Sequence, residues 1–131
     1  MESRLNLTFL ALLAGLAMFC TPMRAHHGSR VSYDVSQKVT LTGTVAQYIW
    51  ANPHVSIIFD VKDKKGTVVS WGAETYAPVK MARSGWTSTS LKPGDQITVT
   101  VFRSRLSATR GFLEKLVFPD GKVTDLGDPT E

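Results

Sequence analysis

Apolar and polar residues alternate along five separate stretches of this 131-residue chain. In the first stretch, Val39, Leu41 and Val45 alternate with threonines, so one face is apolar and the other polar. This period of two is the pattern of a half-buried strand, because successive side chains of an extended segment point to opposite faces. The sequence therefore predicts five main strands and a short last one, at residues 39–50, 55–61, 67–74, 97–101, 112–118 and 122–126.

One segment between the third and fourth strands has helical character. Pro78 suits a first helical turn and Gly85 suits a C-terminal cap, so we expect a helix over Ala77–Ser84. Three strands, a helix and two strands is the order of the OB-fold, a small Greek-key barrel. An immunoglobulin-like sandwich is the alternative, but it needs about seven strands and no central helix. The predicted fold class is all-β, a five-stranded OB-like barrel with one short helix.

The alternation also predicts which side chains point inward. Gly43, inside the first strand, indicates a sharp bend of the kind that small barrels need. On the fifth strand, we expect Phe112, Glu114, Leu116 and Phe118 to share one face. The residues expected in the core are Val45, Val55, Ile57, Phe59, Val69, Trp71, Ile97, Val99 and Leu116.

The first 25 residues have the composition of a secretory signal peptide. Arg4 supplies a positive charge, and the apolar run from Leu7 to Phe19 is shorter than the ~20 residues that a membrane span needs. Ala25 suits the position before a cleavage site. An uncleaved N-terminal anchor is the alternative. We therefore predict four parts, namely a signal peptide at 1–25, an N-terminal arm at 26–38, the OB-like barrel at 39–126 and a polar tail at 127–131.

A cleaved signal peptide predicts a periplasmic or secreted protein with no stable membrane span. Cys20, the only cysteine, lies in the segment to be removed, so the remaining chain can form no disulfide and no thiolate metal site. The formal net charge of +4 is too small to indicate a nucleic-acid partner. No P-loop, G-x-S-x-G, H-E-x-x-H or G-x-G-x-x-G motif is present, so no enzyme class is indicated and we expect a non-enzymatic protein.

Several motifs occur in a characteristic order along the chain. They are His26-His27-Gly28-Ser29, Tyr33-Asp34, Thr40 to Val45, Trp50-Ala51-Asn52-Pro53-His54, Trp71 with Glu74, Arg83 to Trp86, and Leu91 to Asp95. As a set they resemble a bacterial exported family known only as a domain of unknown function. The resemblance implies a small periplasmic or secreted β-domain, and it implies no activity.

Histidines are the main candidates for a binding site. Cleavage after Ala25 makes His26 the N-terminal residue, which then offers an α-amine and an imidazole to one metal ion. His27, His54 and the carboxylate of Glu74 are the remaining candidate ligands. Nitrogen donors in the absence of thiolates favour copper(II) or zinc. No motif in the sequence requires another cofactor. The alternative is that the histidines are incidental residues of a solvated arm and a turn.

Two loops carry further candidate ligand-binding residues. Trp50 and Asn52 lie between the first two strands, and Arg103, Arg105 and Arg110 lie between the fourth and fifth. In an OB barrel these loops border one face, where guanidinium groups can hold a carboxylate or phosphate. The main hypothesis is thus a metal-binding module. An adaptor for an envelope protein or small anionic ligand is the alternative, and a copper oxidoreductase is the weaker one.

Overall fold

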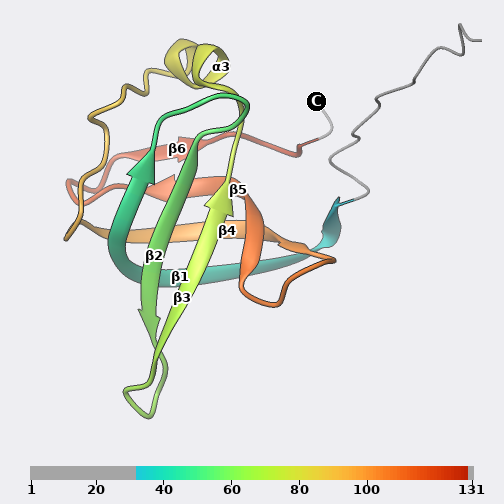
Figure 1. Cartoon of the computed structure of the whole chain (residues 1–131), viewed down its shortest axis with the longest axis vertical. Helices are drawn as coiled ribbons and strands as arrows, with labels where there is room; N and C mark the ends of the chain where they lie inside the picture. The colour runs from blue at the N-terminus through green and yellow to red at the C-terminus, as the bar shows by residue number, and fades with distance from the viewer. Residues whose placement is uncertain (1–31, 130–131) are drawn as a thin grey trace, which may run out of the picture.

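The computed structural model describes residues 32–129, and its elements follow the predicted order (Figure 1). They are β1 (Tyr33–Ile49), β2 (Ser56–Lys62), β3 (Val68–Glu74), α3 (Pro78–Arg83), β4 (Gln96–Ser104), β5 (Arg110–Val117) and β6 (Val123–Asp125). The predicted signal peptide at 1–25 and both His26 and His27 lie outside the described residues. What the sequence predicts for them therefore stays a prediction.

Five strands close into a ring. β3 pairs with β2, β2 with β1, β1 with β4 and β4 with β5, each antiparallel. The ring closes where β5 runs parallel to β3, with Gly72 opposite Arg110 and Glu74 opposite Phe112. β6 adds a short outer strand beside β5. A closed five-stranded ring with a helix between the third and fourth strands is a small OB-like barrel, so the predicted fold is confirmed.

β1 is long because it pairs with two neighbours in turn. Its residues from Lys38 to Thr44 pair with β4, and those from Thr44 to Ile49 pair with β2. Gly43 lies at the changeover, where an added Cβ would be 2.6 Å from the backbone oxygen of Asp60. Only a residue without a side chain permits this close approach. β1 curves strongly between its two partners (Figure 1), in agreement with the bend predicted from Gly43.

The start of β1 lies within the segment 26–38 that the sequence assigns to an arm. Tyr33 and Asp34 pair with Ser104 and Arg103, and an irregularity in register separates this pairing from the rest of the strand. The segment from Asp34 to Lys38 has one apolar residue, Val35, so it shows no regular alternation that would reveal a strand. The first described residues are therefore held against the end of β4.

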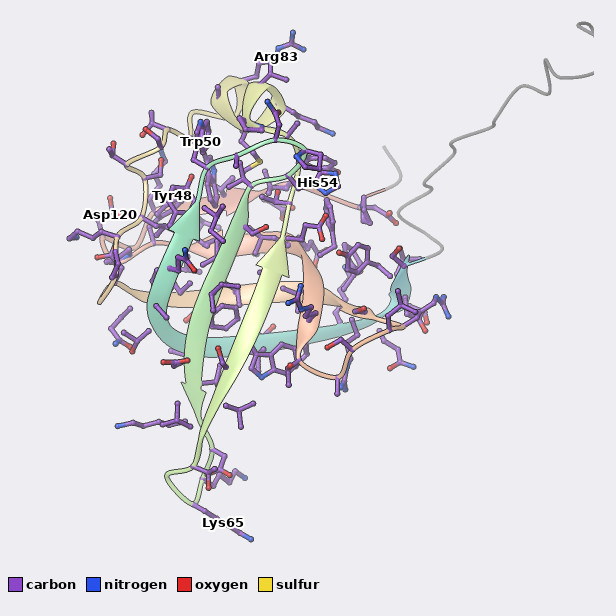
Figure 2. All side chains as sticks on the ribbon, viewed as in Figure 1. Tyr48, Trp50, His54, Lys65, Arg83 and Asp120 are labelled. Carbon is purple, nitrogen blue, oxygen red and sulfur yellow. The ribbon has the colours of Figure 1, made fainter. Side chains whose placement is uncertain are left out.

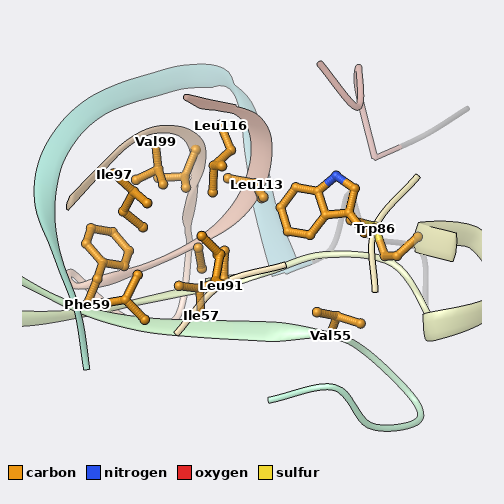
Figure 3. Close-up of a cluster of buried hydrophobic side chains, with 13 residues drawn as sticks. Val55, Ile57, Phe59, Trp86, Leu91, Ile97, Val99, Leu113 and Leu116 are labelled. Atoms are coloured by element: carbon orange, nitrogen blue, oxygen red, sulfur yellow. The ribbon is translucent and has the colours of Figure 1, made fainter. Parts of the chain in front are cut away.

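The hydrophobic core fills the inside of the ring (Figure 3). Trp71 is partly buried and packs against this core, as expected. Val69 was expected to be inside but is 37% exposed, because it lies near the β2–β3 turn, where the hairpin extends beyond the ring (Figure 1). The other expected core residues are buried, namely Val45, Val55, Ile57, Phe59, Ile97, Val99 and Leu116.

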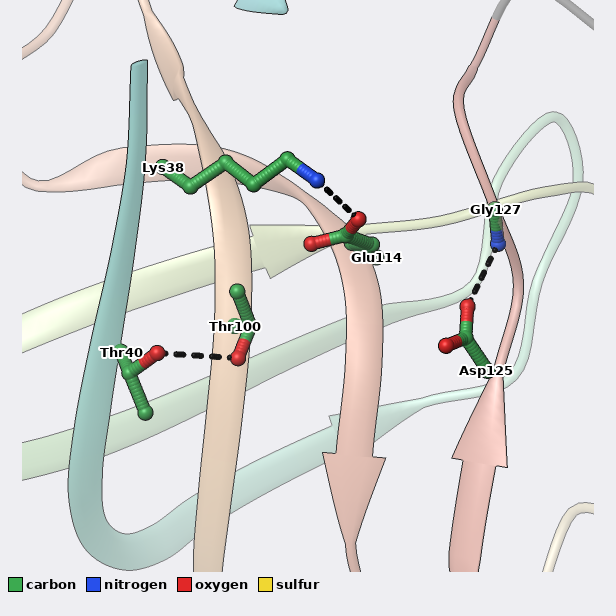
Figure 4. A network of polar contacts seen from close by, with 6 residues as sticks. All are labelled: Lys38, Thr40, Thr100, Glu114, Asp125 and Gly127. Carbon is green, nitrogen blue, oxygen red and sulfur yellow. Dashed lines mark hydrogen bonds and ion pairs between the residues drawn. The ribbon is translucent and has the colours of Figure 1, made fainter.

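β5 contains a bulge that the alternation pattern does not reveal. Lys115 pairs with Thr100 and Leu113 with Val101, which leaves Glu114 without an opposite residue. The extra residue turns the side chains, so that Leu113 and Leu116 both enter the core. The expectation that Phe112 to Phe118 alternate regularly on one face is therefore wrong. Glu114 instead forms an ion pair with Lys38 on β1 (Figure 4).

α3 agrees with the predicted helix to within one residue at each end. Ala77 is its N-cap, Pro78 opens its first turn, and Gly85 follows it with a positive φ of 83°. Met81 is the buried residue of the helix, and its sulfur accepts a hydrogen bond from the Thr75 hydroxyl at 3.2 Å. The helix therefore covers one end of the barrel through Met81.

Candidate functional site

His54 lies in the β1–β2 loop, at the end of the barrel that carries α3 (Figure 2). Its Nδ1 contacts Oε1 of Glu74, the last residue of β3. Backbone hydrogen bonds from Val55 to Tyr76 (3.0 Å) and from Thr75 to Val55 (2.9 Å) continue the β2–β3 ladder past the strand ends. Because Val55 is fully buried, the ladder fixes His54 beside Glu74. Their side chains remain 48% and 36% exposed, so the pair is open to solvent.

The second oxygen of Glu74 is also engaged. The Tyr33 hydroxyl donates a hydrogen bond of 2.8 Å to Oε2 of Glu74. Burial raises the pKa of Tyr33 well above its usual value, and the hydrogen bond and negative charge of Glu74 add to this, whereas the positive charge of Arg110 opposes it. Tyr33 therefore keeps its proton and acts as a donor at neutral pH. Its ring is held by an edge contact with Phe112, at 5.5 Å between centroids.

A small hollow lies beside this group. It has a volume of about 40 Å³ and is lined in part by Tyr33, Ser56, Glu74 and Arg110. This volume suits water-sized molecules and is far below the ~300–1,000 Å³ of pockets for larger organic ligands. The hollow thus brings together the carboxylate of Glu74, the phenol of Tyr33 and the guanidinium of Arg110, and the imidazole of His54 contacts the same carboxylate.

The three predicted arginines do not form one clamp. Arg103 turns back toward the carbonyl oxygen of Ala108, at 3.4 Å, and Arg105 lies 3.4 Å from Asp34. Arg110, the first residue of β5, lines the hollow that Glu74 also lines. The structure therefore brings Arg110 together with the Glu74 end, and leaves Arg103 near the end of β4 and Arg105 in the β4–β5 loop.

Trp50 and Asn52 have different surroundings. The Trp50 ring lies against Tyr48, at 6.2 Å between centroids, and packs on the core (Figure 2). Burial raises the pKa of Tyr48, whose hydroxyl donates to the Thr87 carbonyl oxygen at 2.9 Å. Asn52 is exposed, and the peptide bond between Asn52 and Pro53 is cis. Trp50 thus supports the base of the loop that carries His54.

Of the four predicted metal ligands, the structure places His54 and Glu74 in contact, whereas His26 and His27 precede the described part. Within residues 32–129, no three histidine, cysteine, aspartate or glutamate residues are grouped closely enough to hold a metal ion. Any complete site built on His54 therefore needs donors from the N-terminal segment or from solvent.

Tyr33 is the site residue that sequence reasoning did not select. It was noted only as part of the Tyr33-Asp34 motif, because the polar residues after it conceal the start of β1. The contact between Tyr33 and Glu74 joins positions 41 residues apart. It depends on the ring closure between β3 and β5, which no local pattern encodes.

No helix among residues 32–129 is long and apolar enough to cross a membrane. No curated protein matches the sequence. Among solved structures, the chain is similar to Rim1, a mitochondrial single-stranded DNA binding protein from S. cerevisiae, with 6% identity and a TM-score of 0.47, covering 70% of this chain and 94% of that chain. It is also similar to a ZRD-deleted mutant of TiaS in complex with agmatine, with 18% identity and a TM-score of 0.46. That match covers 72% of this chain and only 27% of TiaS.

The sequence also matches the model of a protein family. The model, described as a family of unknown function (DUF6152), matches residues 13–113, which is more than half of the chain. The match reaches from the predicted signal segment through the ring to the core residue Leu113 on β5. The chain belongs to DUF6152, a family of unknown function whose member here is built on an OB-like barrel.

Proposed function

We propose that the protein is an exported, non-enzymatic binding protein that holds one copper(II) or zinc ion through nitrogen donors. The observation that carries this proposal is the contact between His54 Nδ1 and Glu74 Oε1. A histidine that donates from Nδ1 to a carboxylate presents the lone pair of Nε2 outward, which is the usual arrangement of a metal-binding histidine. Glu74 then orients His54 and increases its basicity, in place of the direct ligand role expected from the sequence.

The N-terminal histidines can reach this position. Tyr33 is hydrogen-bonded to Glu74, and it lies six positions after His27. Six extended residues span at most about 20 Å, so the tether is long enough for His26 and His27 to meet His54. In the cleaved protein, His26 adds its α-amine to its imidazole. Three or four nitrogen donors then surround one ion.

The donor set favours copper(II) or zinc over copper(I). Copper(I) is a soft ion, and thiolate and thioether ligands select it. Among the described residues, Met81 carries the only thioether, and it is fully buried beneath α3 with its sulfur bonded to Thr75. It is therefore a core residue and not a ligand.

The first test uses protein purified from the compartment to which it is exported. Mass spectrometry establishes whether the chain begins at His26. Calorimetric titration with copper(II) and with zinc is then expected to give one ion per chain for this form. A form with one alanine added before His26 is expected to bind more weakly, because the α-amine is displaced while every imidazole remains.

Variants of the described pair give the second test. We expect Glu74→Gln to weaken metal binding by about 10–100-fold, the usual effect of losing a hydrogen-bond partner of a ligand. His54→Ala is expected to weaken binding at least as much, because it removes a donor atom. Asn52→Ala, in the same exposed loop, is the matched control and should leave the affinity unchanged. Equal affinities for His54→Ala and Asn52→Ala would remove His54 from the site.

Affinity is expected to fall as the solution becomes more acidic. Metal ligation requires neutral imidazole and amine groups, and protons compete for the same lone pairs. We expect the affinity for zinc to drop at least tenfold between about pH 7.5 and about pH 5.5. The measurement is calorimetric titration at each pH, with circular dichroism to show that the fold persists. A constant affinity across this range would argue against nitrogen ligation.

A further inference from the structure

The outer face of β2 and β3 carries a second feature, centred on Arg110. Because residue 72 is glycine, nothing projects from β3 at this point. A Cβ added there would lie 3.6 Å from Cγ and 3.9 Å from Nε of Arg110. The Arg110 side chain therefore lies across the strand, over the gap that Gly72 leaves.

A hollow lies on each side of Arg110. The small one of about 40 Å³, described above, leads toward Glu74. The other has a volume of about 240 Å³ and is lined by Ile58, Ser70, Trp71, Gly72, Thr109 and Arg110. Its walls combine apolar surface from Ile58 and Trp71 with the hydroxyl groups of Ser70 and Thr109. This size is below the ~300 Å³ at which pockets for drug-sized ligands begin, so it suits a smaller molecule.

Arg110 has no carboxylate partner among the described residues, although Glu74 lines the small hollow beside it. Both oxygens of Glu74 are occupied, one by Tyr33 and the other by His54. The charge of Arg105, by contrast, is matched by Asp34. The larger hollow therefore holds one positive charge with its hydrogen-bond donors available, next to the apolar surface of Ile58 and Trp71.

We infer that the larger hollow is a binding site for a small organic anion, whose carboxylate or phosphate group is held by Arg110 and whose apolar body lies against Ile58 and Trp71. Guanidinium groups bind carboxylates and phosphates through paired, charge-assisted hydrogen bonds. Ser70 and Thr109 supply further donors at the rim of the larger hollow. The site is separate from the proposed metal ligands and does not require a metal.

The test is an NMR titration of the ¹⁵N-labelled chain after metal has been removed with a chelator and the chelator has been dialysed away. The probes are benzoate, phenyl phosphate and benzamide, which share a ring but differ in charge. We expect benzoate or phenyl phosphate to shift the amide signals of Ile58, Gly72 and Thr109 saturably, and benzamide to cause no saturable shift. The relative affinity of the two anions identifies which head group the site prefers.

Arginine variants complete the experiment. Arg110→Met is expected to weaken anion binding at least about tenfold, because a charge-assisted contact is lost. Arg110→Lys should retain part of the affinity. Arg103→Met, near the end of β4, is the matched control and should have less than about a twofold effect. His54→Ala should leave anion binding unchanged. The metal-binding proposal and the anion-binding proposal can therefore fail independently of each other.

Three outcomes would overturn the inference. The first is benzamide binding as tightly as benzoate. The second is an equal loss of affinity in Arg103→Met and Arg110→Met. The third is the absence of saturable shifts for both anions at concentrations up to about 20 mM.

Discussion

Replacing Leu113 or Leu116 by alanine is expected to lower the free energy of unfolding by about 2–5 kcal/mol in each case. Both side chains are fully buried, and removing either leaves a cavity inside the ring. The bulge at Glu114 is the reason that both leucines contribute, although they are three residues apart on one strand. Urea unfolding monitored by tryptophan fluorescence gives the measurement.

Leu106 provides the matched control for this experiment. It lies in the β4–β5 loop and is 84% exposed, so Leu106→Ala should change the free energy of unfolding by less than about 0.5 kcal/mol. If β5 alternated regularly, only one of the two core leucines would be costly to remove. A large loss for Leu116→Ala together with a negligible one for Leu113→Ala would therefore contradict the bulge.

A second large effect is expected at Gly43. A Cβ at this position would lie 2.6 Å from the Asp60 backbone oxygen and 2.9 Å from Cδ2 of Phe59. Because the oxygen belongs to the backbone of β2, it cannot move without disturbing the pairing of β1 and β2. We expect Gly43→Ala to destabilise the fold by about 1–3 kcal/mol or more, as overpacking of a core does.

Gly72→Ala is the control for Gly43→Ala. Both glycines lie within strands, but a Cβ at residue 72 meets its nearest neighbours at 3.6 Å, which is ordinary contact. We expect Gly72→Ala to change the stability by less than about 1 kcal/mol. Thermal or urea unfolding of the two variants under the same conditions distinguishes them. Equal stabilities would show that β1 does not need its close approach to β2 at residue 43.

The sequence predicts the order of elements well because each main strand carries its own local signal. Threonines alternate with apolar residues on β1 and β4, and Pro78 and Gly85 mark the ends of α3. The inward set is also largely predictable, since a period of two assigns every second residue to one face. These features depend only on neighbours along the chain.

Two errors in the predicted fold arise from tertiary structure, which a local pattern does not encode. Val69 alternates as a core residue does, but the β2–β3 hairpin extends beyond the ring and leaves it exposed. The bulge at Glu114 changes which residues of β5 face inward. A single extra residue in one strand is defined only relative to its partner strand. No pattern within the strand itself reveals it.

The site was predictable in part. The types of His54 and Glu74 identified them as candidates, and the structure places them in contact. The grouping of three arginines was suggested by their spacing alone, yet only Arg110 lines the hollow at Glu74, since Arg105 is engaged by Asp34. Tyr33 escaped notice because its contact crosses the closed ring. A sequence gives the residue types directly, but it does not give the contacts between residues on opposite sides of a closed barrel.

The hydrogen bond from Tyr33 to Glu74 has a consequence for how binding and folding are linked. It connects the first residue of β1 to the last residue of β3, and these two meet only when the ring is closed. An unfolded chain therefore contains every donor group but no assembled site. A ligand held there binds the folded state selectively and adds RT ln(1 + [L]/Kd) to its stability, about 2.7 kcal/mol at a hundredfold excess over Kd. Occupancy of the site would then protect the whole barrel against heat and proteolysis, including strands that the ligand never touches.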